Sequence, residues 1–200
     1  MREIEIKLRL PSAEAAQAVQ AKLPAARAVR HQVNHYYDTA DLAIQRELRG
    51  MLRVRRQDAR WIVCLKLGAS ISDDGTLRTE EIESDWQPPR AWRPEQIGEL
   101  LACGLAPIER LAAVLRRVDL VYLGALENTR SEHSFEGHLI ELDRTLLPRG
   151  RVEHELECET EDPDSLRPKL LDLLRRAGVE AAPQTRTKYQ RFLESLVDKS

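Results

Sequence analysis

The amino-terminal segment alternates charged and branched apolar residues without a break. Residues 3–10 read Glu-Ile-Glu-Ile-Lys-Leu-Arg-Leu. Successive side chains of a β-strand point to opposite faces, so this pattern predicts a strand with one apolar and one charged face. The charged face would carry Glu3, Glu5, Lys7 and Arg9.

The same alternation returns in several later segments. Basic residues carry it in 51–55 and 61–66, and acidic residues carry it in 81–83, 139–143 and 153–159. A single strand of this kind is typical of a sheet face exposed to solvent. Five or six in one chain favour charged faces that converge inside a barrel or a strongly curved sheet. Carboxylates interleaved with Arg and Lys need both cations and an anionic ligand, which hard divalent metals and phosphate oxygens supply together.

Turn and capping residues define the other elements. Ser12 can cap a helix that ends before Pro24, and glycines 104 and 178 suit the ends of two further helices. Shorter helices are expected at 105–111 and 187–197. Beyond residue 10, strands are expected at 33–39, 48–57, 60–68, 76–86, 114–123, 125–132, 137–144 and 152–160. We therefore predict an α+β fold, a closed antiparallel eight-stranded β-barrel with flanking helices, formed by residues 1–200 as a single domain.

Composition narrows the class of function. The chain has 31 Lys and Arg against 33 Asp and Glu, a formal charge of −2, which argues against a nucleic-acid partner. Only 4% of residues are aromatic, so stacking surfaces for single strands are scarce. Because 32% of residues are charged, we expect the charges to form an internal site as well as to keep the protein soluble.

The cysteines and the hydropathy pattern indicate the compartment. Cys64, Cys103 and Cys158 are far apart and lack a C-x-x-C spacing, which argues against disulfides or a structural zinc site. The chain begins with a strand rather than a signal peptide, and no apolar run approaches the roughly 18 residues of a membrane span. We therefore expect a cytoplasmic protein that contacts no membrane.

Two common catalytic arrangements are missing from the sequence. The five histidines form no H-E-x-x-H motif and no evident triad, so a Ser/His/Asp or Cys/His nucleophile is unsupported. A glycine-rich P-loop is absent as well, so phosphate recognition would depend on side chains rather than on a helix N-terminus.

Four motifs, taken in their order along the chain, resemble the CYTH family. They are Glu3-x-Glu5-x-Lys7, Tyr36-Tyr37-Asp38-Thr39, Leu52-Arg53-Val54-Arg55 and Glu155-Leu156-Glu157. Members of this family are the triphosphate tunnel metalloenzymes: class IV adenylate cyclases, thiamine triphosphatases and inorganic triphosphatases. The resemblance extends from Met1 to about Arg191 and implies a metal-dependent enzyme that acts on a linear triphosphate inside a charged β-barrel tunnel.

Paired carboxylates are the candidate metal ligands. Glu3 and Glu5 would stand roughly 6.5–7 Å apart on one strand face. At that spacing they can bind one or two Mg²⁺ or Mn²⁺ ions and leave positions open for water and phosphate. The resemblance implies that Glu155 and Glu157 are metal ligands too. Glu159 extends their row, so which two of the three lie nearest the metal stays open.

Six basic residues match positions at which the family holds the phosphate chain. They are Lys7, Arg53, Arg55, Lys66, Arg130 and Lys188. Arginine offers forked donors to phosphate oxygens, while lysine acts as a movable point charge. The residues expected to be catalytic are Glu5, Lys7, Arg55 and Glu157. The acidic residues expected to support the basic groups are Glu81, Glu83 and Asp143.

The sequence departs from the family pattern at two places. The family often has an arginine two residues before its acidic strand pair, where this chain has Thr79. This leaves open whether Arg78 or Glu80 enters the tunnel. Some relatives carry a lysine where this chain has Asn128, which predicts a weaker hold on one phosphate or an altered choice of triphosphate.

The predicted reaction is metal-assisted transfer of a phosphoryl group to water. Because the chain has little aromatic material for a base or thiazolium pocket, we favour inorganic tripolyphosphate as the substrate. Two alternatives remain. One is an enzyme for an organic triphosphate, either a thiamine triphosphatase or a class IV adenylate cyclase, and the other is a non-catalytic polyphosphate-binding module. The sequence leaves a homodimer open.

Overall fold

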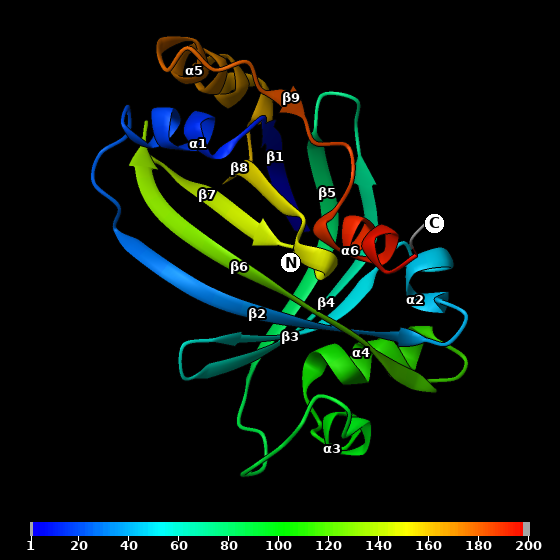
Figure 1. Ribbon diagram of the computed structural model, residues 1–200. Coiled ribbons are helices and arrows are strands. Elements are labelled where there is room, and N and C mark those ends of the chain that lie inside the picture. The colour runs from blue at the N-terminus through cyan, green and yellow to red at the C-terminus, as the bar shows by residue number, and fades with distance from the viewer. Residues whose placement is uncertain (1, 198–200) are drawn as a thin grey trace. The chain divides into compact units, whose positions relative to one another are not determined.

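The computed structural model describes residues 2–197 (Figure 1). The strands are β1 Arg2–Leu10, β2 Ala28–Thr39, β3 Met51–Gln57, β4 Arg60–Ile71, β5 Thr76–Trp86, β6 Leu120–Phe135, β7 His138–Leu146, β8 Val152–Glu159 and β9 Ala182–Pro183. The helices are α1 Ala13–Gln20, α2 Ala43–Arg46, α3 Ile97–Leu101, α4 Ala106–Val114, the 3₁₀ turn η1 Pro148–Gly150, α5 Pro163–Arg176 and α6 Lys188–Leu196. Within residues 2–197, the helices are all too short or too polar to cross a membrane.

The strands join into one sheet whose order closes on itself. The order is β5-β4-β3-β2-β6-β7-β8-β1-β9, and β5 pairs in addition with β1. This confirms the predicted fold class, a closed antiparallel barrel of eight strands with flanking helices. The ninth strand adds only two residues.

One predicted strand boundary is wrong. Separate strands were expected at 114–123 and 125–132, but helix α4 extends to Val114 and a single strand, β6, runs from Leu120 to Phe135. Gly124 lies inside that strand with a φ of 128°, a conformation that glycine adopts at little cost. The glycine therefore lets the strand continue where the sequence suggested a turn.

The chain divides into two compact units, each built from separate segments. Unit 1 contains Gln32–Ala69 and Thr79–Leu126, and unit 2 contains Glu3–His31, Ser70–Arg78 and the described chain from Glu127 onward. Each unit has its own apolar core. Each also carries one set of the charged residues singled out above, and the two units are described in turn.

In unit 2, helices α1 and α5 cover the apolar face of β1 and β8 (Figure 1). Ile6 and Leu8 of β1 are buried with Leu156 of β8 against Val19 of α1 and Leu170 of α5. Burying each such side chain contributes about 1.5–3 kcal/mol. Because side chains alternate along a strand, this packing directs the charged residues of β1 and β8 to the opposite face.

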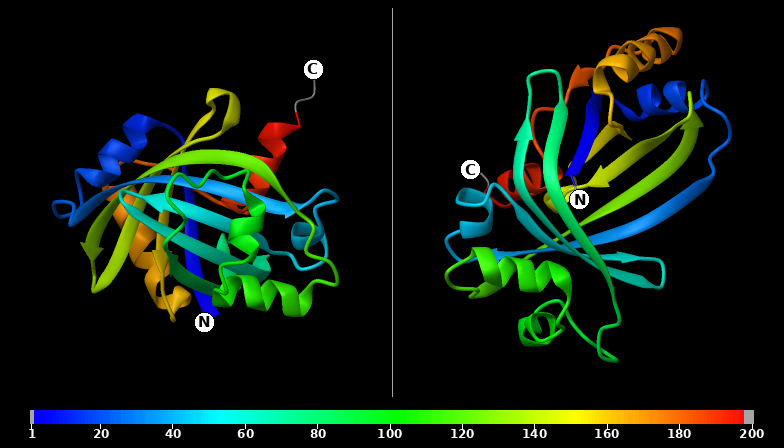
Figure 2. Two further views of the ribbon diagram at one scale, coloured as in Figure 1. Left: turned by 90° about the horizontal axis from the view of Figure 1, so that it is seen from below. Right: turned by 180° about the vertical axis from the view of Figure 1, so that it is seen from behind.

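In unit 1, the apolar face of β3 and β4 packs against α3 and α4 (green in Figure 2). Leu52 and Val54 of β3 join Leu65 of β4 in this core, together with Leu100 of α3 and Leu111 of α4. The alternate residues of the same two strands, among them the predicted arginines, therefore lie on the other face.

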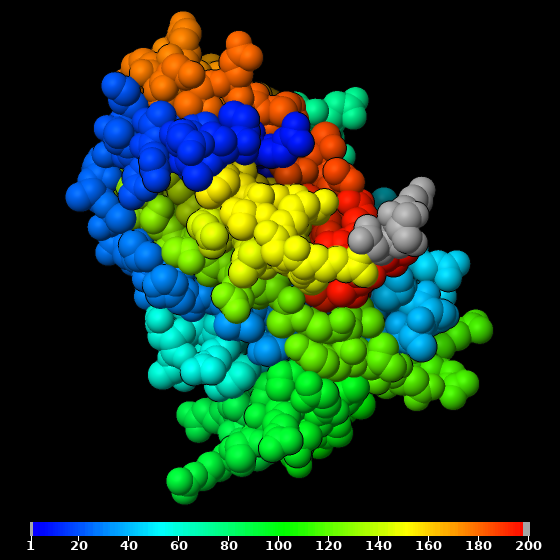
Figure 3. All heavy atoms as spheres, in the orientation of Figure 1, coloured from blue at the N-terminus to red at the C-terminus, as the bar shows by residue number. Residues whose placement is uncertain are grey.

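Helix α6 ends the described part of unit 2. Thr187 caps it, since its side chain accepts a hydrogen bond from the Gln190 backbone while the Gln190 side chain accepts one from the Thr187 backbone. The helix (red) packs beside η1 at the start of β8 (yellow), as Figure 3 shows. The capping box fixes the point at which α6 begins and thus the place of its first residue, Lys188.

Candidate functional site

Strand register brings charged residues of unit 2 into rows. Lys7 of β1 lies opposite Glu157 of β8, which lies opposite Glu141 of β7. In a neighbouring row, Glu155 faces Asp143, which faces Arg130 of β6. Adjacent strands are about 4.8 Å apart, so side chains on one face of these rows can touch. Five residues of these rows, together with Glu5 of β1 and Lys188 of α6, form a group that we call the carboxylate cluster. Its members are Glu5, Lys7, Arg130, Glu141, Asp143, Glu157 and Lys188.

Glu157 makes the most cation contacts in this cluster. It accepts hydrogen bonds from Lys7, from Arg130 at 2.7 Å and from Lys188 at 2.6 Å, and it is almost fully buried. Burial alone would raise the pKa of Glu157, but Lys188, Lys7 and Arg130 outweigh it and hold that pKa well below the ordinary range. Glu157 is therefore a fixed anion at neutral pH.

Three carboxylates of the cluster approach one another closely. Glu5, Glu141 and Glu157 each place an oxygen within 4.8 Å of the oxygens of the other two. Burial raises the pKa of Glu141, and Glu157 and Asp143 raise it further, although the paired Arg130 opposes the shift. Glu141 was not among the predicted site residues. Its signal in the sequence is its position two residues before Asp143, on the same face of the same strand.

Asp143 organises the basic residues of the cluster. Its two oxygens accept a forked pair of hydrogen bonds from Arg130 at 2.8 and 2.6 Å, and Lys188 donates to it at 2.7 Å. Asn128 donates to it at 3.0 Å, so the residue found in place of a lysine supports Asp143. Burial opposes ionisation of Asp143, but Arg130 and Lys188 lower its pKa below the ordinary value.

The remaining two predicted metal ligands lie outside the three-carboxylate group. Glu3 is buried at the start of β1. Glu155 is fully buried, and its Oε2 accepts hydrogen bonds from Arg191 at 2.5 Å and lies 3.2 Å from Lys188 Nζ. Its Oε1 has no hydrogen-bond partner. Arg191 is a second residue that the sequence did not single out, because the face of α6 on which it would lie was not predicted.

Unit 1 assembles the other predicted residues into an arginine cluster, defined as Arg53, Arg55, Lys66, Glu81 and Glu83. Arg53 donates to Glu83 at 3.0 Å and lies 4.0 Å from Glu81, while Lys66 lies 3.4 Å from Glu81. Arg55 donates through Nε to the side-chain oxygen of Asn34 at 2.9 Å. The two glutamates thus hold Arg53 and Lys66 in place.

A thiol lies beside the arginine cluster, and one nitrogen within the cluster has no hydrogen-bond partner. The Cys64 thiol donates to Glu81 at 3.1 Å, and Arg53 Nε is buried without a hydrogen-bond partner. Burial raises the pKa of the Cys64 thiol, although Arg53 opposes that shift. Cys64 is therefore a neutral hydrogen-bond donor at physiological pH. The unpaired Nε of Arg53 leaves one strong donor for an anionic ligand.

Arg78 and Glu80, the two residues that the sequence left open on β5, are two positions apart and so share one face of the strand. Glu80 is exposed and pairs with Arg110 of α4 at 3.4 Å, on the side covered by helices. Thr79 is buried and donates to the Leu67 carbonyl at 2.9 Å. The alternation of β5 therefore aligns Glu81 and Glu83 with Thr79 and keeps Glu80 apart from the arginine cluster.

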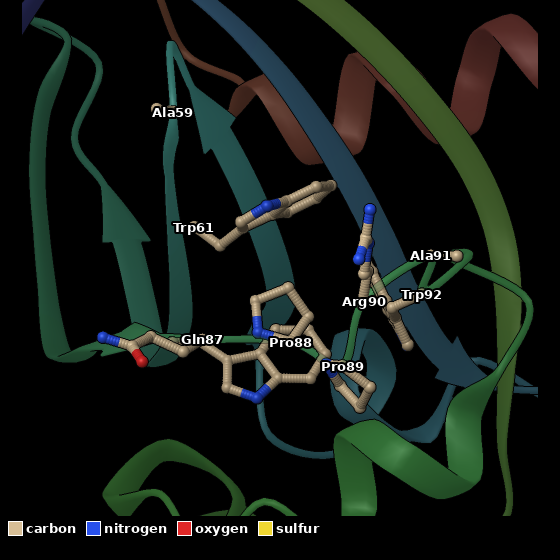
Figure 4. Close-up of a pocket in the computed structure, with 9 residues that line it drawn as sticks. Ala59, Trp61, Gln87, Pro88, Pro89, Arg90, Ala91 and Trp92 are labelled. Atoms are coloured by element: carbon tan, nitrogen blue, oxygen red, sulfur yellow. The ribbon is translucent and has the colours of Figure 1, made fainter.

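The tryptophans of unit 1 pack with one another. Trp92 meets Trp61 and Trp86 edge-on, with ring centroids 5.3 and 4.7 Å apart. Together with residues 87–91 they line a pocket of about 350 Å³ (Figure 4). Trp61 belongs to the core face of β4, so by strand alternation this pocket lies on the face opposite to Lys66.

Comparison with known proteins agrees with this architecture. The family model of the CYTH domain matches residues 1–189. YjbK of Bacillus subtilis, a candidate triphosphatase, is 26% identical over 196 residues, covering 96% of this chain and 94% of that protein. Among solved structures, HpAC1 of Hippeastrum is 29% identical with a TM-score of 0.86, covering 96% of this chain and 95% of that one. HpAC1 is described as a candidate adenylyl cyclase with a dominant triphosphatase activity.

A more distant structure shows the same fold. A candidate adenylate cyclase from Bacillus halodurans is 23% identical with a TM-score of 0.70, covering 96% of this chain and 98% of that one. With a family match over nearly its whole length, the chain belongs to the CYTH domain family.

Proposed function

We propose that this protein is a metal-dependent triphosphatase that hydrolyses a linear triphosphate, with inorganic tripolyphosphate as the favoured substrate. The observation that carries the proposal is the carboxylate cluster, in which three close carboxylates alternate with Lys7, Arg130 and Lys188. A cluster that binds only anions gains nothing from buried carboxylates. The same residues can satisfy a divalent cation and phosphate oxygens at once.

The donor set fits a hard divalent cation. Glu5, Glu141 and Glu157 offer carboxylate oxygens within 4.8 Å of one another, and such oxygens are the ligands that Mg²⁺ and Mn²⁺ prefer. The buried Oε1 of Glu155 also lacks a partner. We assign Glu5 and Glu157 as ligands, with Glu3, Glu141 and Glu155 as further donors. A bound ion would neutralise charge on phosphate oxygens and make a bound water more acidic.

The basic residues of the carboxylate cluster bind and stabilise phosphate in this proposal. Burial lowers the pKa of Lys7 and of Lys188, but the surrounding carboxylates outweigh it and raise both above the ordinary value. Both ammonium groups therefore stay charged throughout the physiological range. Lys7, Lys188 and Arg130 can donate to oxygens on which negative charge develops as the phosphoanhydride bond breaks. Asp143 orients two of these three donors.

The arginine cluster is proposed to bind phosphate oxygens as well. Arg53 and Arg55 offer forked donors, and Lys66 adds a point charge. Glu81 and Glu83 orient these groups through the ion pairs described above. We propose that residues 1–200 act as one catalytic domain, in which Glu5, Lys7, Arg55 and Glu157 are the catalytic residues.

The aromatic residues favour a substrate without a ring. The three tryptophans pack among themselves on the face of β4 opposite to Lys66. This arrangement supports tripolyphosphate over thiamine triphosphate or a nucleoside triphosphate. The alternative, an enzyme that forms cyclic AMP from ATP, is favoured by the likeness to a candidate adenylyl cyclase, yet that relative has a dominant triphosphatase activity.

Product analysis tests the proposal. Purified protein is supplied with Mg²⁺ or Mn²⁺ and with tripolyphosphate, ATP or thiamine triphosphate in parallel, with a chelator in matched controls. We expect phosphate to be released fastest from tripolyphosphate and only when metal is present. Cyclic AMP and pyrophosphate from ATP would identify a cyclase instead. Tripolyphosphate binding without turnover of any substrate would identify a polyphosphate-binding module.

A further inference from the structure

Arg191 is a buried cation outside the residues assigned to the reaction. Only 2% of it is exposed. Its Nε donates to Glu153 at 2.7 Å, its Nη2 to Glu155 at 2.5 Å and its Nη1 to the backbone carbonyl of Arg186 at 2.6 Å. The guanidinium of α6 is thus bound at three points, two of them carboxylates of strand β8.

Lys188 shares both the helix and one of these carboxylates. It is the first residue of α6, three positions before Arg191, so the two side chains leave the helix on one face. Its ammonium group lies 3.2 Å from Glu155 Oε2, the oxygen that also accepts from Arg191. From there it reaches Asp143 at 2.7 Å and Glu157 at 2.6 Å.

Because Arg191 is buried, breaking its contacts with β8 would cost free energy, and this cost holds α6 in place. A buried guanidinium is costly unless it is paired and hydrogen-bonded, and Glu153 and Glu155 provide that pairing. Burial lowers the pKa of Arg191, but these two glutamates raise it above the ordinary value. The helix can therefore leave β8 only by separating a buried cation from two carboxylates.

We propose that Arg191 is a positioning residue, which anchors α6 to β8 through Glu153 and Glu155 and thereby holds Lys188 in the carboxylate cluster. This inference rests on the proposed function, in which Lys188 binds phosphate oxygens. In this proposal the two carboxylate oxygens of Glu155 have different roles. Oε2 holds the two cations of α6, and Oε1 stays open to a further donor or cation.

A double-mutant cycle tests the anchor. Arg191→Lys keeps the positive charge that the two glutamates need, but replaces a three-point fork by a single ammonium group. We expect kcat/KM for tripolyphosphate to fall about tenfold in Arg191→Lys. In the Lys188→Met background the same change should cause no further loss, because Arg191 acts through Lys188. Arg186→Lys is the matched control, since Arg186 is exposed in the same segment and pairs with Glu194.

A second measurement does not depend on turnover. Acetylation of Lys188 by a small amine reagent is followed by mass spectrometry in the folded protein. We expect Lys188 to react faster in Arg191→Lys and faster still in Arg191→Met, and to keep its wild-type rate in Arg186→Lys. Thermal unfolding of each variant shows which proteins are folded at the labelling temperature. If Arg191→Met does not fold, the acetylation rate in Arg191→Lys alone decides the test.

The outcomes separate this proposal from the proposed function. Unchanged Lys188 reactivity in folded Arg191→Lys would overturn the anchor, and so would losses of kcat/KM that add fully to those of Lys188→Met. If the wild type hydrolyses no triphosphate, the proposed function fails. The acetylation rates then still decide whether Arg191 positions Lys188.

Discussion

The carboxylate cluster and the arginine cluster differ in the sign of their surplus charge. The carboxylate cluster combines four carboxylates with three cations, all largely buried, whereas the arginine cluster combines three cations with two glutamates. The first therefore has one negative charge to spare and the second one positive charge. Buried groups of one sign in excess favour a ligand of the other sign.

The clusters also differ in how firmly their internal partners are held. Asp143 and Glu157 are buried and contact two and three cations, respectively, while the Glu83 side chain is 41% exposed and contacts Arg53. Solvent weakens the latter pair, so phosphate oxygens can compete for Arg53 at small cost. Under the proposed function, this difference favours the carboxylate cluster for the cation and the arginine cluster for exchangeable phosphate donors.

The largest effect is expected from Glu5→Gln, which removes one charge from the three-carboxylate group. Metal-dependent turnover of tripolyphosphate should fall at least about 10³-fold, since a metal ion contributes several kcal/mol of charge stabilisation. Mn²⁺ titration should show weakened binding by the same variant, while thermal unfolding changes little. Glu80→Gln, on the helix-covered side of β5, is the control and should leave both unchanged. Wild-type turnover in Glu5→Gln would remove the metal assignment.

Asp143→Ala tests how far the carboxylate cluster holds itself together. The change removes the carboxylate that accepts the forked hydrogen bonds of Arg130 and one of the buried partners of Lys188, so we expect the free energy of unfolding to fall by about 3–5 kcal/mol. Urea unfolding measures it. The control Asp172→Ala removes an exposed pair with Arg175 and Arg176 on α5 and should cost less than about 1 kcal/mol. An equal loss of unfolding free energy in the two variants would contradict the expectation that the buried cluster contributes more stability than the exposed pair.

Arg55→Ala tests the binding role of the arginine cluster. We expect tripolyphosphate to bind about 10- to 100-fold more weakly, because hydrogen bonds to a charged group contribute about 1.5–3 kcal/mol. Calorimetric titration with tripolyphosphate measures this change. Arg56→Ala is the matched control, since Arg56 is the next residue and its guanidinium lies over Trp61 on the other face. Equal weakening by both variants would indicate a general loss of charge instead.

The smallest effect is the pH dependence of the Glu83 pair. Burial would raise the pKa of Glu83, but Arg53 and Arg55 outweigh it and lower that pKa below its ordinary value of about 4.3. Its stabilisation is therefore present above the ordinary pKa and is lost as pH falls through the lower folded value. The stability difference between wild type and Glu83→Gln should be below about 1 kcal/mol at pH 7 and should shrink as the pH falls below the ordinary pKa of the carboxyl group. A difference that stays constant as the pH falls would exclude the ion pair as its cause.

The alternation of residues predicted much of the fold because it is a local property. Each strand needs only its own sequence to separate an apolar from a charged face, and the charged residues of β1, β3 and β8 lie on the expected faces. The continuous strand through Gly124 was missed because a glycine there is compatible with either a turn or a strand.

The contacts of the site depend on register, which the sequence leaves open. Glu141 approaches Glu5 and Glu157 because β7 and β1 both flank β8 at one particular alignment. A shift by one residue would have turned it away. The hydrogen bond from Arg191 to Glu155 likewise depends on which face of α6 packs against β8. The short sequence of α6 does not determine that face.

The pairing of the first long strand with the eighth has a consequence for synthesis. Lys7 and Glu157 are 150 positions apart, and Lys188 follows later still. Contacts between such distant segments form only after a long loop has closed. A growing chain therefore carries Glu5 and Lys7 long before α6 is made, and it cannot complete the cluster until that helix has left the ribosome. A product truncated before Thr187 would retain Asp143, Glu155 and Glu157 without the two cations of α6. Such a chain would have an excess of negative charge in its interior and would be less stable.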